Sequence, residues 1–228
     1  MSFTRRISAG IFIIMLSFGL YAQSIDDVGA KLNEGNEAMK AKQYAKAITA
    51  YEAAIKMSGT VGAEADALKE SSQQQLVNAY YRNGITLYKS KNYESSVANL
   101  NNGRKLAGEI GDTDMENKLT VVTAKVLSSK GMSLIKDNDL DGAYQAFDEA
   151  HQVKANCVIS YYGKGLVWKE RGDFNKMMAS MDKAIELGEK EPKMGKYVER
   201  SKDAASKALL AEATEEINKE HGEEAAQH

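Results

Sequence analysis

The residues with the clearest capacity for chemistry lie in the segment from Asp137 to Gly142, which reads DNDLDG. Aspartates at three alternate positions before a glycine match the start of a calcium-binding loop, whose carboxylates coordinate a hard cation. The twelfth position of such a loop normally holds a Glu that chelates with both oxygens, whereas this chain has Asp148. The alternative is a tight turn between two paired helices, in which Asp139 caps the second helix. We favour the turn and predict no metal and no cofactor, with calcium binding as the alternative.

Histidine and cysteine offer little for catalysis. The histidines are His151, His221 and His228, and two of them fall in the last eight residues. No catalytic triad or zinc site can be assembled from them, and no nucleophile has an activating base nearby. Cys157 is the single cysteine, so no intrachain disulfide can form, and we expect it to be a small buried residue. The sequence therefore predicts that the protein is not an enzyme.

Two glycines in the segment YGKGLVW invite comparison with a dinucleotide-binding loop. Gly163 and Gly165 follow no expected strand, however, and such a loop needs a strand before it and a helix after it. We interpret both as glycines that allow helices to pack closely.

The composition favours helices. The chain has one proline, 7% aromatic residues, 43% hydrophobic and 27% charged residues. Strands prefer aromatic and β-branched side chains, so we expect essentially no strands. The formal net charge of −2 identifies no partner, and the absence of a dominant basic face argues against nucleic acid.

A pattern of small and large residues recurs around four glycines, Gly35, Gly84, Gly131 and Gly165. A small residue at the closest approach of two antiparallel helices lets their backbones come together, while a large one fills the space beside it. Large apolar residues follow each glycine after nine and after sixteen positions, and a small one follows after nineteen. In chain order these are Tyr44, Tyr51 and Ala54; Tyr93, Leu100 and Gly103; Leu140, Phe147 and Ala150; and Phe174, Met181 and Ala184.

This pattern resembles the tetratricopeptide repeat (TPR) signature over residues 28 to 192, most fully at Leu127, Gly131, Leu140, Ala143, Phe147 and Ala150 and at Tyr161, Gly165, Phe174 and Ala184. It departs from the signature at Lys31, where an aromatic residue is usual, and in lacking prolines at the ends of the first three repeats. The resemblance implies an all-α fold, a right-handed superhelical array of antiparallel helix pairs (a TPR-like α-solenoid) with a C-terminal capping helix. An irregular helical bundle is the alternative.

The expected organisation has four parts: a signal peptide at 1–22, four helical hairpins at 23–192, a capping helix at 193–220, and a frayed tail at 221–228. Arg5 and Arg6 precede an apolar run from Ile7 to Leu20, which is short for a membrane span, the competing interpretation. We therefore expect export to the periplasm or an envelope-associated location, with no membrane insertion after cleavage.

The glycines of the first three repeats stand further apart than the 34 residues between Gly131 and Gly165. We expect the extra residues, near 63–75 and 114–123, to lengthen the first helices of repeats two and three, which would then project as a ridge. A capping box at Thr113 and Glu116 would start the second of these. Helices are expected to end in left-handed caps at three residues, Gly59, Asn156 and Gly188.

The resemblance also implies that the first helix of each pair lines a concave groove. The positions that face it carry tyrosines and a recurring lysine, seen at Lys40, Lys89 and Lys136, which form either a basic line or the polar ends of amphipathic helices. Asn36 and Lys125 occupy two positions of a carboxylate clamp used by some family members, but Leu32, Arg82 and Ser129 do not fit that clamp. The candidate partner-binding residues are Asn36, Lys40, Tyr81, Ile85, Tyr88, Lys89, Lys125, Ser128, Met132, Lys136, Tyr162 and Lys169.

Tyrosines and lysines together suit an extended peptide of acidic or mixed character, because the rings supply contact area and the ammonium groups steer the ligand. The sequence thus predicts a non-catalytic protein–protein interaction scaffold that binds a protein or peptide partner in an envelope assembly. The alternative is a structural subunit that self-associates through its extended helices, and this alternative predicts a homo-oligomer.

Overall fold

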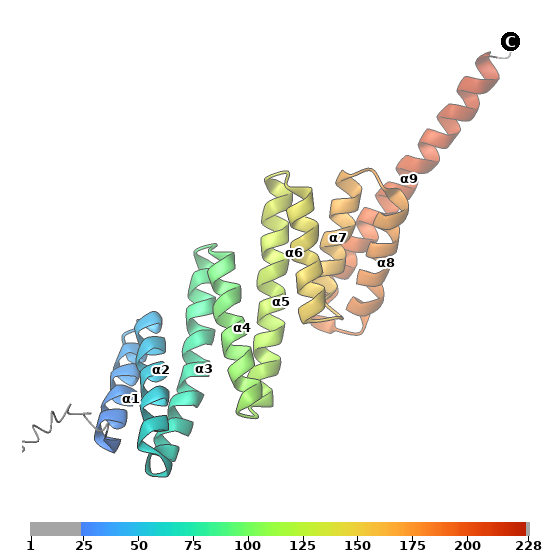
Figure 1. Ribbon diagram of the computed structural model, residues 1–228. Helices are drawn as coiled ribbons and strands as arrows, with labels where there is room; N and C mark the ends of the chain where they lie inside the picture. The colour runs from blue at the N-terminus through green and yellow to red at the C-terminus, as the bar shows by residue number, and fades with distance from the viewer. Residues whose placement is uncertain (1–23, 227–228) are drawn as a thin grey trace, which may run out of the picture.

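The structure is a computed structural model that describes residues 24–226, and the expected signal peptide at 1–22 lies outside that part. Within those residues the chain is all-α and has no strand (Figure 1). The helices are α1 (Ile25–Lys40), α2 (Tyr44–Val61), α3 (Asp66–Lys89), α4 (Tyr93–Glu109), α5 (Thr113–Lys136), α6 (Leu140–Val153), α7 (Val158–Glu170), α8 (Phe174–Glu189) and α9 (Gly195–Ala226), with 3₁₀ turns at Ala63–Ala65 and Pro192–Met194. Consecutive helices pack as pairs, which confirms the TPR-like α-solenoid.

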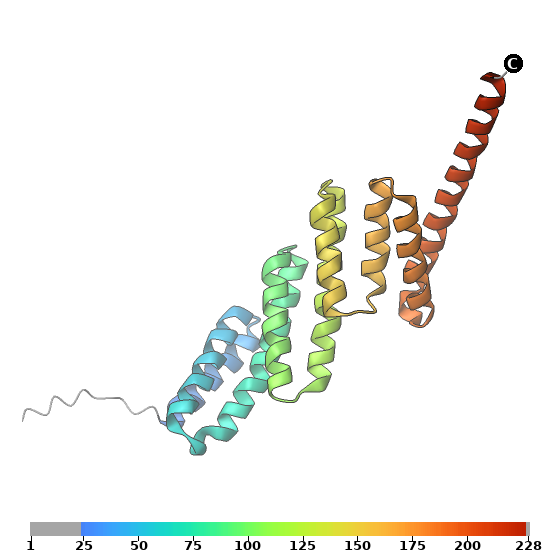
Figure 2. The ribbon, with the colours of Figure 1, turned by 45° about the vertical axis from the view of Figure 1, so that its right-hand side comes forward.

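The hairpins α1–α2, α3–α4, α5–α6 and α7–α8 are displaced from one another like steps of a staircase (Figure 2). The long helices α3 and α5, of 24 residues each, connect the steps. One half of each packs on the preceding hairpin and the other half on its own partner. Residues 66–75 and 114–123 lie in these two helices, whereas residues 63–65, also expected in a lengthened helix, form a separate 3₁₀ turn. The projecting ridge was wrong, because Ala65, Ser72, Leu119 and Thr123 have no exposed surface.

Each repeat glycine lies against the large residue sixteen positions later. A β-carbon on Gly84 would stand 2.7 Å from Leu100, one on Gly131 2.7 Å from Phe147, and one on Gly165 2.8 Å from Met181. Gly35 faces the ring of Tyr51 in the same way. The four large residues are fully buried, so these contacts form the core of each hairpin, as the spacing predicted.

The turn within each hairpin has a common geometry. The residue seven positions after the repeat glycine adopts a left-handed conformation, with φ of 58° at Lys42, 60° at Lys91, 60° at Asn138 and 71° at Gly172. The next residue is the N-cap that directly precedes the second helix, and in three hairpins its side chain accepts a hydrogen bond from a backbone N–H group. These capping residues are Asn92, Asp139 and Asp173, whereas Gln43 makes no such bond.

The predicted left-handed caps were wrong. Gly59 lies inside α2, which runs on to Val61 before Gly62 at φ 89°, and α6 ends before Asn156, whose φ is not positive. Gly188 is buried inside α8, where it lies against Val198. The capping box at Thr113 was also wrong, because Asp112 is the capping residue and accepts the N–H of Met115 at 3.0 Å.

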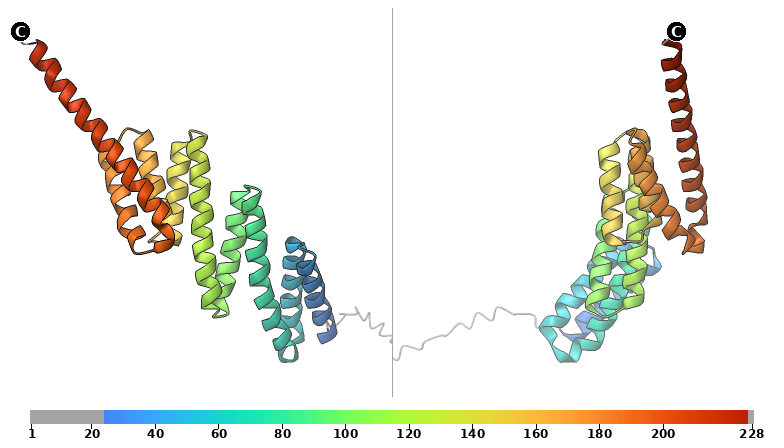
Figure 3. Two further views of the ribbon diagram at one scale, coloured as in Figure 1. Left: turned by 180° about the vertical axis from the view of Figure 1, so that it is seen from behind. Right: turned by 90° about the vertical axis from the view of Figure 1, so that its right-hand side faces the viewer.

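Helix α9 covers the last hairpin with its first half only. Val198, Ser201 and Ala205 are buried against the preceding helices, whereas Leu209, one turn further along α9, is 51% exposed. From there the helix extends away from the solenoid, as the views from behind and from the side show (Figure 3). It continues to Ala226, beyond the predicted start of the frayed tail.

Candidate partner-binding grooves

A groove of about 480 Å³ lies on the face formed by the first helices of the pairs. We call it the lysine–tyrosine groove. The turn between α3 and α4, the second half of α5, and the starts of α7 and α9 surround it. Its lining residues are Tyr88, Lys91, Tyr93, Lys125, Ser128, Ser129, Met132, Ser133, Lys136, Asp137, Ile159, Lys196 and Tyr197.

The groove is basic. Among the residues that the structure describes, Lys91, Lys125, Lys136 and Lys196 line it, with Asp137 as the one acidic lining residue. None of these four lysines forms an ion pair with another residue of the described range 24–226, whereas Lys130, nearby on α5, is paired with Glu94 at 3.0 Å. Unpaired ammonium groups on one concave surface attract an anionic ligand.

Tyrosine rings are held in place along the same groove. The hydroxyl of Tyr88 hydrogen-bonds with the Ser129 hydroxyl at 3.0 Å, and its ring lies 6.2 Å from that of Tyr93. Tyr197 stacks at a tilt against Tyr162, with 5.7 Å between centroids. Rings fixed in this way offer contact area with little further loss of conformational entropy on binding.

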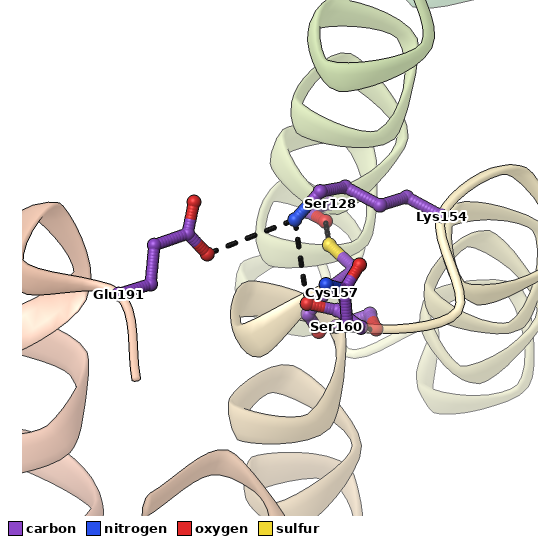
Figure 4. Close-up of polar contacts among 6 residues, drawn as sticks. Ser128, Lys154, Cys157, Ser160 and Glu191 are labelled. Carbon is purple, nitrogen blue, oxygen red and sulfur yellow. Dashed lines mark hydrogen bonds and ion pairs between the residues drawn. The ribbon is translucent and has the colours of Figure 1, made fainter. Parts of the chain in front are cut away.

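Where α5, α6 and α7 meet, the side chains of the groove wall are engaged in contacts within the protein. Cys157 is buried, as predicted, and its sulfur lies 3.7 Å from the hydroxyl of Ser128 (Figure 4). Ser160 donates a hydrogen bond to the Cys157 carbonyl at 2.8 Å. Lys154 Nζ lies 3.7 Å from a carboxylate oxygen of Glu191, which links the α6–α7 loop to the segment that leads into α9. This ion pair helps to hold the start of α9 at the groove.

The structure brings together five of the residues proposed from the sequence: Tyr88, Lys125, Ser128, Met132 and Lys136. Ser128 is fully buried and already bonded to the Ala124 carbonyl at 2.8 Å, so its hydroxyl is not free for a ligand.

A second set of proposed residues lies outside this groove. Tyr162 and Lys169 line a different groove, beside α9. Asn36 accepts a hydrogen bond from the Tyr51 hydroxyl at 2.9 Å, and Lys40 pairs with Glu37 at 2.7 Å. Tyr81 carries the ammonium group of Lys118 over its ring at 4.2 Å. Ile85 and Lys89 line neither groove.

Eight lining residues were missed from the sequence, and four of them are lysines or tyrosines: Lys91, Tyr93, Lys196 and Tyr197. The sequence reasoning considered positions on the first helices alone, whereas these residues come from a hairpin turn, a second helix and the C-terminal helix. The left-handed turn position shared by the hairpins is the signal that could have pointed to Lys91.

The second groove, of about 790 Å³, lies between α9 and the pair α7–α8. We call it the α9 groove. Its lining residues are Tyr162, Leu166, Lys169, Gly172, Phe174, Met177, Arg200, Asp203, Ala204, Lys207, Ala208, Ala211, Glu212, Glu215, Glu216 and Lys219. Acidic and basic side chains are balanced here, unlike in the lysine–tyrosine groove.

The DNDLDG segment forms the turn after α5 with residues 137–139 and the start of α6 with residues 140–142. Asp139 accepts the N–H of Gly142 at 2.9 Å and so caps α6, while Asp141 forms an ion pair with Arg171. In the part of the chain that the structure describes, no three His, Cys, Asp or Glu side chains gather as metal ligands would. The same part contains no helix with both the length and the apolar character needed to cross a bilayer.

These features define the class of protein: an α-solenoid of TPR-like helical hairpins with grooves on the face of its first helices. Comparisons with known proteins agree with this class. The tetratricopeptide repeat family profile matches residues 28–60. A TPR repeat-containing protein of Methanocaldococcus jannaschii is 29% identical over 73 residues, which is 32% of this chain and 13% of that protein's length. These two matches support a relationship with the TPR family.

Among solved structures, that of MamA aligns over 73% of this chain and 94% of its own, with 17% identity and a TM-score of 0.34.

Proposed function

We propose that this protein is a non-catalytic scaffold that binds an extended, acidic segment of a partner protein in the lysine–tyrosine groove. The observation that carries the proposal is the set of four lysines, Lys91, Lys125, Lys136 and Lys196, which line one groove without ion pairs in the described part of the chain. Carboxylates of a partner would supply the missing counter-charges, and the neighbouring tyrosines would pack against its backbone and apolar side chains.

The probe for this proposal is a fluorescein-labelled peptide of alternating Glu and Ala, compared with its Lys and Ala counterpart. The protein should bind the acidic peptide more tightly, and binding should weaken as salt rises because the attraction is between exposed charges. Fluorescence anisotropy measures both effects. Equal binding of the two peptides would contradict the proposal.

Substitutions then locate the site. Lys125→Glu with Lys136→Glu should weaken binding of the acidic peptide by on the order of tenfold or more, since two attractions become repulsions. Lys46→Glu with Lys56→Glu is the matched control, because it changes the net charge equally at two exposed residues of α2 that line neither groove. Equal losses in the two variants would show that net charge, and not the groove, determines binding.

The proposed setting is the cell envelope, after export directed by the N-terminal segment. The support is the sequence pattern of Arg5, Arg6 and the apolar run that follows. Mass spectrometry of the protein recovered from its native cell would detect a mature chain that starts near Gln23. An intact Met1 terminus in the cytoplasmic fraction would contradict export.

A further inference from the structure

The charges on the face of α9 that lines its groove follow an antisymmetric order. Asp203, Lys207, Ala211, Glu215 and Lys219 are spaced four residues apart, so they lie along one side of the helix, and all five line the α9 groove. On the N-terminal side of Ala211, the first charged residue of the row is the base Lys207. On the C-terminal side, the first is the acid Glu215. Read backwards, the row presents the opposite charge at every charged position.

We propose that the α9 groove holds the α9 helix of a second copy of this protein, antiparallel to the first and related to it by a two-fold axis at Ala211. In this register Lys207 faces Glu215 of the other copy, and Asp203 faces Lys219 of the other copy. The two-fold axis repeats each contact with the two copies exchanged, so the interface contains two pairs of each kind. A parallel arrangement in the same register would place like charges opposite one another. The row is therefore complementary to itself in one direction only.

The remaining charges of the groove agree with that direction. On α9 itself, the inner half of the lining carries Arg200, Asp203 and Lys207 and is net basic, whereas the outer half carries Glu212, Glu215, Glu216 and Lys219 and is net acidic. An antiparallel second helix brings its outer, acidic half beside the inner, basic half of the first.

The groove also has the shape and the unfilled surface that a helix requires. Ala204, Ala208 and Ala211 line it, and small side chains let two helix backbones approach closely. Tyr162 and Leu166 supply apolar surface from α7. Past Ala208, every residue of α9 up to Lys219 is exposed, so this part of the helix is not covered by any other part of the described chain.

Ion pairs inside α9 make a sharp test available. Lys207 pairs with Asp203 at 2.8 Å, and Lys219 pairs with Glu215 at 2.6 Å, in the same helix. Lys207→Glu and Glu215→Lys each break one of these pairs, and their combination leaves both broken. The combination restores only the contact between copies, where Glu at 207 meets Lys at 215.

The full chain is studied by sedimentation equilibrium over a range of protein concentrations. We expect a monomer–dimer equilibrium whose dissociation constant rises on the order of tenfold or more in Lys207→Glu and in Glu215→Lys. In the double variant it should return close to the wild-type value. A monomer at every concentration, or a double variant as weak as the single ones, would overturn the proposal.

Cross-linking tests the register. Ala211→Cys lies on the proposed two-fold axis and should join two copies with a short bifunctional maleimide, whereas Ala213→Cys, which points away from the groove side, should not. The native Cys157 is 4% exposed and does not compete. Preferential cross-linking through residue 213 would assign the contact to the opposite face, which carries Leu210 and Ile217, and would overturn the proposal. Because this groove is separate from the lysine–tyrosine groove, either inference can fail while the other stands.

Discussion

The ring of Phe147 packs directly on the backbone of Gly131, so that a β-carbon on this glycine would stand 2.7 Å from two ring atoms. The same ring also meets Gly163 of the next hairpin, which confirms Gly163 as a packing glycine. One buried side chain therefore joins two repeats, and each of them contributes a glycine to receive it.

Gly131→Ala should destabilise the protein by about 1–3 kcal/mol, because the added methyl group overfills a packed contact. Gly59→Ala is the matched control: Gly59 lies inside α2, and a β-carbon there would meet no atom of the described chain within 4 Å. It should stabilise the protein by about 0.5–1 kcal/mol through helix propensity. Chemical denaturation followed by circular dichroism measures both, and the same sign for the two variants would contradict this packing role.

Lys42→Gly should stabilise the protein by about 0.5–1 kcal/mol. Lys42 is held at φ 58°, where a side chain clashes with its own backbone and glycine does not. The same change at Lys56, an exposed position inside α2, should destabilise by about 1 kcal/mol. Thermal unfolding of the two variants should shift in opposite directions, and a loss of stability in Lys42→Gly would refute strain at the turn.

Gln43→Asp should add the side-chain cap that the first hairpin lacks. Gln43 has φ −89° and ψ 62°, close to the φ −88° and ψ 80° of Asp139, which does cap its helix. We expect a gain of about 1 kcal/mol, and a loss of similar size for Asp139→Ala. Denaturant midpoints provide the measurement. An unchanged midpoint in Gln43→Asp would mean that the backbone at this turn does not accept a cap.

Asp148→Asn should destabilise the protein at neutral pH and have no effect in acid. Lys164 on α7 donates a hydrogen bond to Asp148 on α6 at 2.7 Å, and this contact lowers the pKa of the carboxyl below its ordinary 3.8. The ionised carboxylate therefore contributes stability above pH 3.8, and the contribution is lost as the pH falls through the lowered pKa. Because Asp148 is partly exposed, the difference at pH 7 should be at most about 1 kcal/mol.

Unfolding of Asp148→Asn and the parent at pH 7 and at pH 2 tests this expectation. Glu149→Gln, on the same helix, is the control, because Glu149 has no ion pair to any residue that the structure describes. A stability difference between Asp148→Asn and the parent that persists unchanged at pH 2 would assign it to something other than the ion pair.

The sequence alone determined the class of the fold and the core of each hairpin. Gly84 and Leu100, or Gly165 and Met181, are joined by one short turn, so a constant spacing of sixteen residues is enough to bring them into contact. The role of Asp139 as a helix cap is equally local, since a cap bonds within three residues of itself. These contacts recur at constant sequence spacings because each hairpin has the same local geometry.

Only the tertiary structure decided how the repeats are displaced and where the grooves lie. The displacement of the hairpins depends on how much of α3 and of α5 packs on the preceding hairpin and how much packs on its own partner helix. That division is set by contacts over whole hairpins. That displacement brings Lys91 from one repeat, Lys136 from the next and Lys196 from α9 to one groove. It also leaves the outer half of α9 without a neighbour, because the last hairpin is too short to cover a helix of 32 residues.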